Sequence, residues 1–169
     1  MDSYNVIGAL ALAIADEVQR SVQQHTPEEG PAAAALALLA NEPGVTIVRL
    51  RSAVGLSHPG AVRLVDRLVD EGVFERRPAL HDRRAVALHL TPAGMRMADA
   101  VTKAKASVLE RALARCTPAE AQVMTGLAAK MLGGLVRDAD HGYAVCRFCV
   151  FDACEDCPVD AELCERRLS

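Results

Sequence analysis

The chain has 169 residues, which is enough for one domain with a sizeable core, or for one domain with an appendage. Hydrophobic residues make up 51% of the chain, which argues against overall disorder. The net charge is −3, and no apolar run approaches the roughly 20 residues that a membrane-spanning helix needs, so a membrane protein is excluded.

Two helices are expected at the start of the chain. Apolar residues recur at helical spacing over residues 3–24, and residues 31–41 are rich in Ala, which favours close helix packing. The stretch HTPEEGP separates the two segments, and Thr26 with Glu29 has the spacing of a capping box. Because aromatic residues make up only 3% of the chain, we expect a core of Ala, Leu and Val.

A pair of short helices with a glycine-containing turn is expected next. Thr46 can cap a helix that stops at Gly55, and Ser57 can cap a second helix that ends at Gly72. Two helices joined by such a turn are typical of a helix-turn-helix. Two extended segments, 73–78 and 85–90, then predict a β-hairpin.

Two long helices are expected after the hairpin. Thr91 precedes Pro92 at the start of a helix that runs to about residue 115. Thr117 with Glu120 forms a second capping box, which opens a last helix that fades near residue 137. The predicted fold is therefore mainly α with a small β-hairpin.

Positive charge is concentrated in the middle of the chain. Residues 46–96 contain nine Arg against five acidic residues, whereas residues 138–169 contain eight acidic residues and three Arg. This separated distribution fits a local anion-binding face, despite the negative net charge.

The stretch GLSHPGAVRLVDRLVDEGVFERR, followed by HDRRAVALHLTPAG, resembles the winged helix-turn-helix core of the MarR (multiple antibiotic resistance regulator) family. The resemblance covers roughly residues 4–137. It implies a homodimer on double-stranded DNA at a palindromic operator, with a small-molecule effector between the dimer helices and the winged domain. On this basis residues 1–45 are expected to be dimerisation and support helices, 46–96 the winged helix-turn-helix and 97–140 the C-terminal dimerisation helices. The resemblance does not explain residues 141–169, which are expected to be a cysteine-rich metal-binding tail.

Candidate DNA contacts lie on the second helix of the predicted motif and at the hairpin tip. A helix in the major groove reads base edges with its N-terminal residues, so we expect His58 and Arg63 to contact bases. By resemblance Arg84 enters the minor groove and Asp82 orients the wing; Arg76 and Arg77 support the wing or touch phosphate. The full predicted set is Ser57, His58, Gly60, Arg63, Arg67, Asp82, Arg83 and Arg84. An ordinary solvated arginine loop is the alternative for the hairpin tip.

Five of the six cysteines lie within residues 146–164. The N-terminus has no positive region typical of a signal peptide, which favours a cytoplasmic location, where disulfides are rare and a cysteine cluster indicates metal or redox chemistry. The spacing Cys-x2-Cys-x4-Cys-x2-Cys predicts a tetrahedral Zn²⁺ site. Its expected ligands are Cys146, Cys149, Cys154 and Cys157, with Cys164 or His141 as a substitute, whereas Cys116 is interpreted as an ordinary free cysteine.

The same cysteines leave other chemistry open. The run from Cys149 through Cys154 to Cys157 matches part of the plant-type [2Fe–2S] pattern, so an iron–sulfur cluster is the alternative to zinc. A metal-free thiol switch is the third interpretation. In each case the tail follows the last long helix, through which it could affect the DNA-reading helices.

The leading interpretation is a dimeric, sequence-specific DNA-binding transcriptional regulator, with repression as the expected direction and with modulation by the cysteine tail. The chain has no phosphate-binding glycine loop, HExxH motif or nucleophile elbow, so an enzyme is not expected. A thiol–disulfide oxidoreductase is the first alternative, although the βαβ context of such proteins is missing. The second alternative is a DNA-tethered module that docks a partner protein through its acidic tail.

Overall fold

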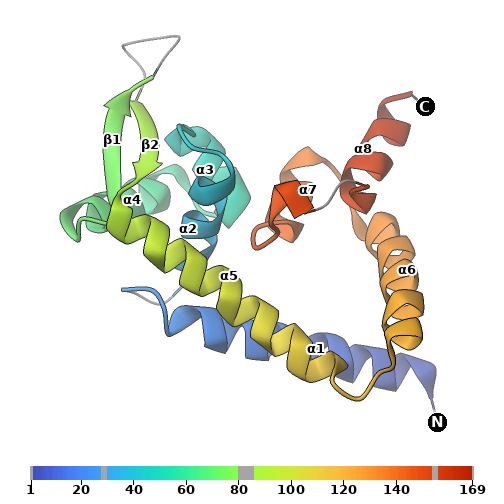
Figure 1. Cartoon of the computed structure of the whole chain (residues 1–169). Helices are drawn as coiled ribbons and strands as arrows, with labels where there is room; N and C mark the ends of the chain where they lie inside the picture. The colour runs from blue at the N-terminus through green and yellow to red at the C-terminus, as the bar shows by residue number, and fades with distance from the viewer. Residues whose placement is uncertain (1, 28–29, 80–85, 154–155, 169) are drawn as a thin grey trace.

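The computed structural model describes residues 2–27, 30–79, 86–153 and 156–168. These form a mainly helical fold with one antiparallel β-hairpin (Figure 1), which confirms the predicted fold class. The elements in chain order are α1 (Ser3–Gln23), α2 (Ala32–Asn41), α3 (Ile47–Val54), α4 (His58–Asp70), β1 (Phe74–Pro78), β2 (Val86–Leu90), α5 (Pro92–Leu113), α6 (Pro118–Leu135), α7 (Ala139–Val145), the short 3₁₀ turn Phe151–Ala153 and α8 (Pro158–Leu168).

Four helices begin where the sequence predicts a cap. The side chains of Thr46, Ser57, Thr91 and Thr117 each accept a hydrogen bond from the backbone N–H three residues later. The capping box predicted at Thr26 is wrong for α2, because that helix begins five residues further on, after Pro31, and has no side-chain cap. The Thr26 hydroxyl instead donates to the carbonyl of Gln23.

Helix α2 is the centre of the core. Every residue from Ala32 to Leu39 is buried, because α3, α5 and β2 pack around the helix. Its alanines let these neighbours approach closely, which confirms the prediction of an aromatic-poor core, and the leucines fill the space between them. Phe74 at the start of β1 is the largest fully buried side chain.

The hairpin is short, and its two strands pair without interruption from Phe74–Leu90 to Pro78–Val86. Phe74 pairs with Leu90 at the base, and Pro78 pairs with Val86 at the outer end. An additional bridge joins Val45 to Leu88, so the hairpin is also tied to the segment that precedes α3. The predicted strands agree with these bounds to within one residue at each start.

Helices α1 and α6 leave apolar faces uncovered in the single chain. Helix α1 lies along α5, and α6 turns away from the far end of α5 (Figure 1). Large exposed side chains on the two helices are Tyr4, Val6, Ile7, Leu10, Leu12, Val123, Met124, Leu127, Met131 and Leu135. Many large apolar side chains exposed on two helices are typical of a surface that contacts another protein. Within the described part of the chain, no helix is long and apolar enough to span a membrane.

The segment after α6 folds back onto the rest of the molecule. Helix α7 packs against α3, and α8 packs against both α6 and α7 (Figure 1). Gly142 of α7 is buried against α8, where an added Cβ would lie 3.0 Å from Val159 and 3.2 Å from Leu163. These two helices were not predicted from the sequence.

The capping box at the start of α6 predicts a pH dependence of stability. Thr117 donates its N–H and its hydroxyl to the Glu120 carboxylate at 2.8 and 2.9 Å, which lowers the pKa of Glu120. The stabilisation is therefore fully present above the ordinary glutamate pKa and is lost as the pH falls through the lowered value. In thermal unfolding, Glu120→Ala should have a lower Tm than the unaltered chain, and this difference in Tm should shrink on acidification. A difference in Tm that does not depend on pH would contradict a stabilising role of the Glu120 carboxylate.

Candidate nucleic-acid interface and cysteine lobe

Helices α3 and α4 form the predicted helix-turn-helix. Helix α3 ends at Gly55, whose φ of 68° lies in the left-handed region that glycine adopts without strain. The backbone N–H of Leu56 then bonds to the carbonyl of Arg51, and Ser57 caps α4. The tight turn fixes the angle at which α4 leaves α3.

Helix α4 has one buried and one exposed face. Ala61, Leu64, Val65 and Leu68 are buried, Arg63 and Arg67 are exposed on the opposite side, and His58 is exposed at the start of the helix. Within the described residues Arg63 makes no ion pair or hydrogen bond, so its guanidinium is available for an external acceptor. The structure therefore leaves both arginines exposed on one face of α4 and His58 exposed at its start.

Ser57 and Gly60 have structural roles at the same helix end. The Ser57 hydroxyl accepts the Gly60 N–H at 3.3 Å, and an added Cβ at Gly60 would lie 3.3 Å from that hydroxyl. Ser57 remains exposed, so its cap does not prevent contact with a ligand. Gly60 offers only its backbone.

The hairpin is linked to α4 by an ion pair. Arg76 on β1 pairs with Asp66 on α4, and Arg77 pairs with Glu75 on its own strand. The first pair supports the expectation that Arg76 holds the wing in place. Asp82, Arg83 and Arg84, the predicted wing-tip contacts, lie outside the described residues.

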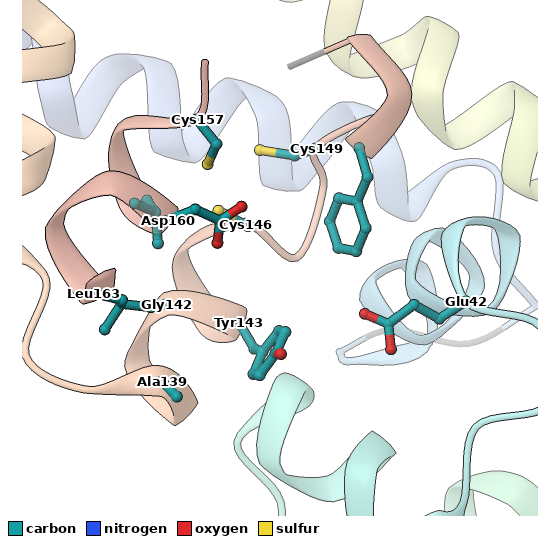
Figure 2. Close-up of a pocket in the computed structure, with 11 residues that line it drawn as sticks. Glu42, Ala139, Gly142, Tyr143, Cys146, Cys149, Cys157, Asp160 and Leu163 are labelled. Carbon is teal, nitrogen blue, oxygen red and sulfur yellow. The ribbon is translucent and has the colours of Figure 1, made fainter. Parts of the chain in front are cut away.

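The sulfur atoms of three cysteines face one another in a cavity of about 270 Å³ (Figure 2). Cys146 ends α7, Cys149 follows in the next turn and Cys157 immediately precedes α8. The Cys149 N–H bonds to the Cys146 carbonyl at 2.8 Å, which closes the turn between the first two thiols. We call residues 139–164, apart from 154–155, the cysteine lobe.

Two of these thiols share a hydrogen bond. The bond from Cys146 lowers the pKa of Cys149 to about 6, opposed by burial and assisted by the positive charge of Lys105. The same bond, together with burial, raises the pKa of Cys146. The shared hydrogen bond therefore favours the thiolate at Cys149 over that at Cys146, and the thiolate is the form of cysteine that binds metals.

The remaining predicted ligands are not brought to this cavity. Cys164 is exposed and does not line the cavity, and the same is true of Cys116, which was interpreted as an ordinary free cysteine and not as a ligand. His141 uses its Nδ1 atom to accept the Arg137 N–H at 3.2 Å. Cys154 lies outside the described residues. Among the described residues, no group of three His, Cys, Asp or Glu side chains has the geometry of a formed metal site.

The cysteine lobe is anchored to α2 and α5 by residues that were not singled out from the sequence. The Asn41 side chain at the end of α2 donates to the Cys149 carbonyl at 2.9 Å and accepts the Phe151 N–H at 3.1 Å. Lys105 on α5 donates to the Phe148 carbonyl at 2.8 Å. No sequence motif identifies either residue, because both act on backbone atoms more than 40 positions away.

A second anchor is formed on α3. The guanidinium carbon of Arg49 lies 3.1 Å from the centre of the Tyr143 ring, and Arg49 also pairs with Glu42 at 2.9 Å. A cation over an aromatic face is attracted by the ring, and more strongly where water is partly excluded. Tyr143 and Phe148 also pack against the main core, so the lobe and helix α3 form one contact surface.

Comparison with known proteins identifies the domain that contains this helix-turn-helix. Residues 29–85, from just before α2 to the hairpin, match the MarR family. The chain contains a MarR family domain. The match ends well before the cysteine lobe.

A curated protein and solved structures agree with this assignment. A putative transcriptional regulatory protein for the hcr operon of Thauera aromatica is 29% identical over 92 residues, which cover 54% of this chain and 55% of that protein, so the likeness spans about half of each. A mutant of S. aureus MepR has a TM-score of 0.69 at 17% identity, covering 80% of this chain and all of that one. A second S. aureus MepR mutant, bound to an oligodeoxyribonucleotide, has a TM-score of 0.60 at 17% identity, covering 80% and 99%.

Proposed function

We propose that this chain is a sequence-specific DNA-binding transcriptional regulator of the cytoplasm. The main supporting observation is that α4, inside a MarR domain, leaves His58 exposed at its capped start and Arg63 and Arg67 exposed along one face. An α-helix fits the major groove, and arginine is well suited to guanine edges and to phosphates. The similar MepR structure with bound oligodeoxyribonucleotide supports the same use of the fold.

We also propose that the working form is a homodimer built on α1 and α6. The apolar side chains on these helices have no cover within the described chain, and a second copy supplies a matching surface by two-fold symmetry. A two-fold dimer presents two copies of α4 to successive major grooves, which matches a palindromic operator. Repression is the direction we assign, because a dimer seated on a promoter obstructs polymerase.

Regulation is proposed to act through the cysteine lobe, as a zinc site or, alternatively, an iron–sulfur cluster. The three thiols that share one cavity favour metal or redox responsiveness over an inert tail. A small-molecule effector remains a separate proposal that rests on the family alone. A thiol–disulfide oxidoreductase is less well supported, because Cys146 and Cys149 sit beside helices and not at the end of a βαβ unit.

The test of DNA recognition uses Arg63. Duplexes are first selected from a random pool with the unaltered chain, and affinities are then measured at several fixed salt concentrations. Arg63→Ala should weaken binding to the selected duplex by about 1–3 kcal/mol, since a base-reading or phosphate-bound guanidinium is lost. Arg115→Ala is the matched control, because it removes the same exposed side chain near the far end of α5.

Two results would reject the proposed function. One is the absence of any enriched duplex, and the other is an equal effect of Arg63→Ala and Arg115→Ala. A loss confined to Arg63→Ala, with unchanged thermal stability, supports recognition through α4. The slope of affinity against salt then tells a phosphate contact from a base contact, because only the former makes the slope shallower.

A further inference from the structure

We propose that Cys146, Cys149 and Cys157 together hold one thiolate-ligated metal centre, and that this centre keeps the cysteine lobe docked on helices α2 and α3. The proposal extends beyond DNA binding, because it assigns ligands and a mechanical role to a segment that lies outside the MarR domain. It is carried by the placement of the thiols, by the small core of the lobe and by the contacts that join the lobe to α2, α3 and α5.

The fold selects three cysteines out of the five whose side chains are described. The thiols of Cys146, Cys149 and Cys157 line one cavity and face one another (Figure 2), whereas Cys116 and Cys164 are exposed elsewhere. The closed turn from Cys146 to Cys149 is the arrangement by which a Cys-x2-Cys pair aims two sulfurs at one centre. Asp160 lines the same cavity and offers a carboxylate as an oxygen donor.

The lobe has little apolar core to hold the thiols in place without a metal. Among its described residues only Gly142 and Val159 are buried. Between Cys146 and Cys157 the described backbone contains only one 3₁₀ turn. A small segment with this composition gains most of its order from a ligand, and a metal bound only to the ordered form contributes its binding free energy to that order.

The same backbone that carries the thiols is bound to α2 and α5. Asn41 bonds to the carbonyl of Cys149 itself and to the N–H of Phe151, two residues further on. Lys105 on α5 donates to the neighbouring carbonyl of Phe148 at 2.8 Å. A metal bound to Cys149 therefore also restrains the backbone of residues 148–151, to which Asn41 and Lys105 are hydrogen-bonded.

These contacts give the metal a route to the DNA-reading helix. Asn41 ends α2, Arg49 lies in the following helix α3, and α3 is the first helix of the helix-turn-helix. The route differs from the one expected from chain order, which runs through the last long helix, because α7 contacts α3 directly. This step rests on the proposed function, whereas metal binding itself does not.

The first experiment titrates the reduced, metal-free full-length chain with Co²⁺ and then displaces the Co²⁺ with Zn²⁺. One equivalent of Co²⁺ should produce thiolate charge-transfer absorption and tetrahedral ligand-field bands, which Zn²⁺ abolishes. Single Ser substitutions at Cys146, Cys149 or Cys157 should weaken binding at least about 10–100-fold, the loss that even outer-shell partners cause. Cys116→Ser and Cys164→Ser should titrate as the unaltered chain does.

Metal analysis of protein purified without oxygen distinguishes a single zinc ion from an iron–sulfur cluster at these cysteines. Zinc near one per chain supports a single ion, and iron with matching acid-labile sulfide supports a cluster on the same ligands. The proposal is overturned if neither metal co-purifies and the reduced chain shows no stoichiometric Co²⁺ binding. It is also overturned if Cys116→Ser or Cys164→Ser weakens binding as much as Cys149→Ser does.

Docking is tested by amide hydrogen exchange of the peptide that contains Phe151. Zn²⁺ should slow exchange there in the unaltered chain, and Asn41→Ala should abolish this protection while Co²⁺ still binds. Unchanged exchange with and without metal would overturn the docking part. DNA affinity is measured on the same samples. Arg63→Ala should still bind the metal but should bind DNA more weakly. If metal-free protein or Cys149→Ser still binds DNA, the proposed function stands independently of the metal.

Discussion

Gly94→Ala is expected to destabilise the protein by about 3 kcal/mol, at the upper end of the cost of forcing one extra carbon into a packed core. Gly94 is buried in the first turn of α5, and an added Cβ would lie 2.3 Å from the carbonyl oxygen of Val73. That oxygen cannot withdraw easily, because it accepts the Thr91 N–H at 3.0 Å and the Thr91 hydroxyl at 3.2 Å. For a chain of this size the loss corresponds to a Tm lower by roughly 6–12 °C.

The measurement is thermal or urea unfolding, with Gly134→Ala as the matched control. Gly134 also lies within a helix, but no atom lies within 4 Å of an added Cβ there. Alanine favours the helix over glycine, so this control should be neutral or more stable by about 0.5–1 kcal/mol. Equal stabilities of the two variants would show that the backbone around Gly94 relaxes and that the close approach of α5 to Val73 is not required.

Leu127→Glu is expected to convert a dimer into monomers. Leu127 is 56% exposed on α6, so the substitution leaves the fold of the single chain intact. If a second copy covers it, two-fold symmetry removes two leucines from the interface and buries two carboxylates. At about 1.5–3 kcal/mol for each leucine, the dissociation constant should rise by roughly 10²–10⁴-fold.

Molar mass in solution, from sedimentation or light scattering, measures this effect. Gln122→Glu is the control, because it places the same carboxylate at an exposed polar position of the same helix. A monomeric Leu127→Glu beside a dimeric Gln122→Glu supports the interface, and DNA affinity should fall with it, since each monomer reaches one half-site. Identical masses for both variants and the unaltered chain would refute dimerisation through this face.

Most elements from α1 to α6 were predictable because local signals and tertiary packing agree there. Ser57, Thr91 and Thr117 are caps in the sequence and caps in the structure. The capping box predicted at Thr26 was wrong because its spacing alone does not show where a helix starts. Helix α2 starts after Pro31. The apolar spacing in residues 3–24 identified α1, but periodicity does not reveal whether a second copy covers the helix.

The cysteine lobe could be predicted only in part. Spacing pointed to Cys146, Cys149 and Cys157, and these thiols do share a cavity. Nothing local indicated that the lobe would fold back, because its anchors are Asn41, Lys105 and the ring of Tyr143 under Arg49. Such contacts join residues remote in sequence and use ordinary side chains on backbone atoms or on an aromatic face, so they form no motif.

The placement of Tyr143 gives the molecule its own optical reporter. The chain has no Trp and only two Tyr, so its intrinsic ultraviolet emission arises from Tyr4 and Tyr143. Tyr4 is 89% exposed on α1, whereas the ring of Tyr143 lies beneath the Arg49 guanidinium at the contact between the lobe and α3. In a Tyr4→Phe background, all remaining emission comes from that contact, so undocking of the lobe can be followed in real time without any attached dye.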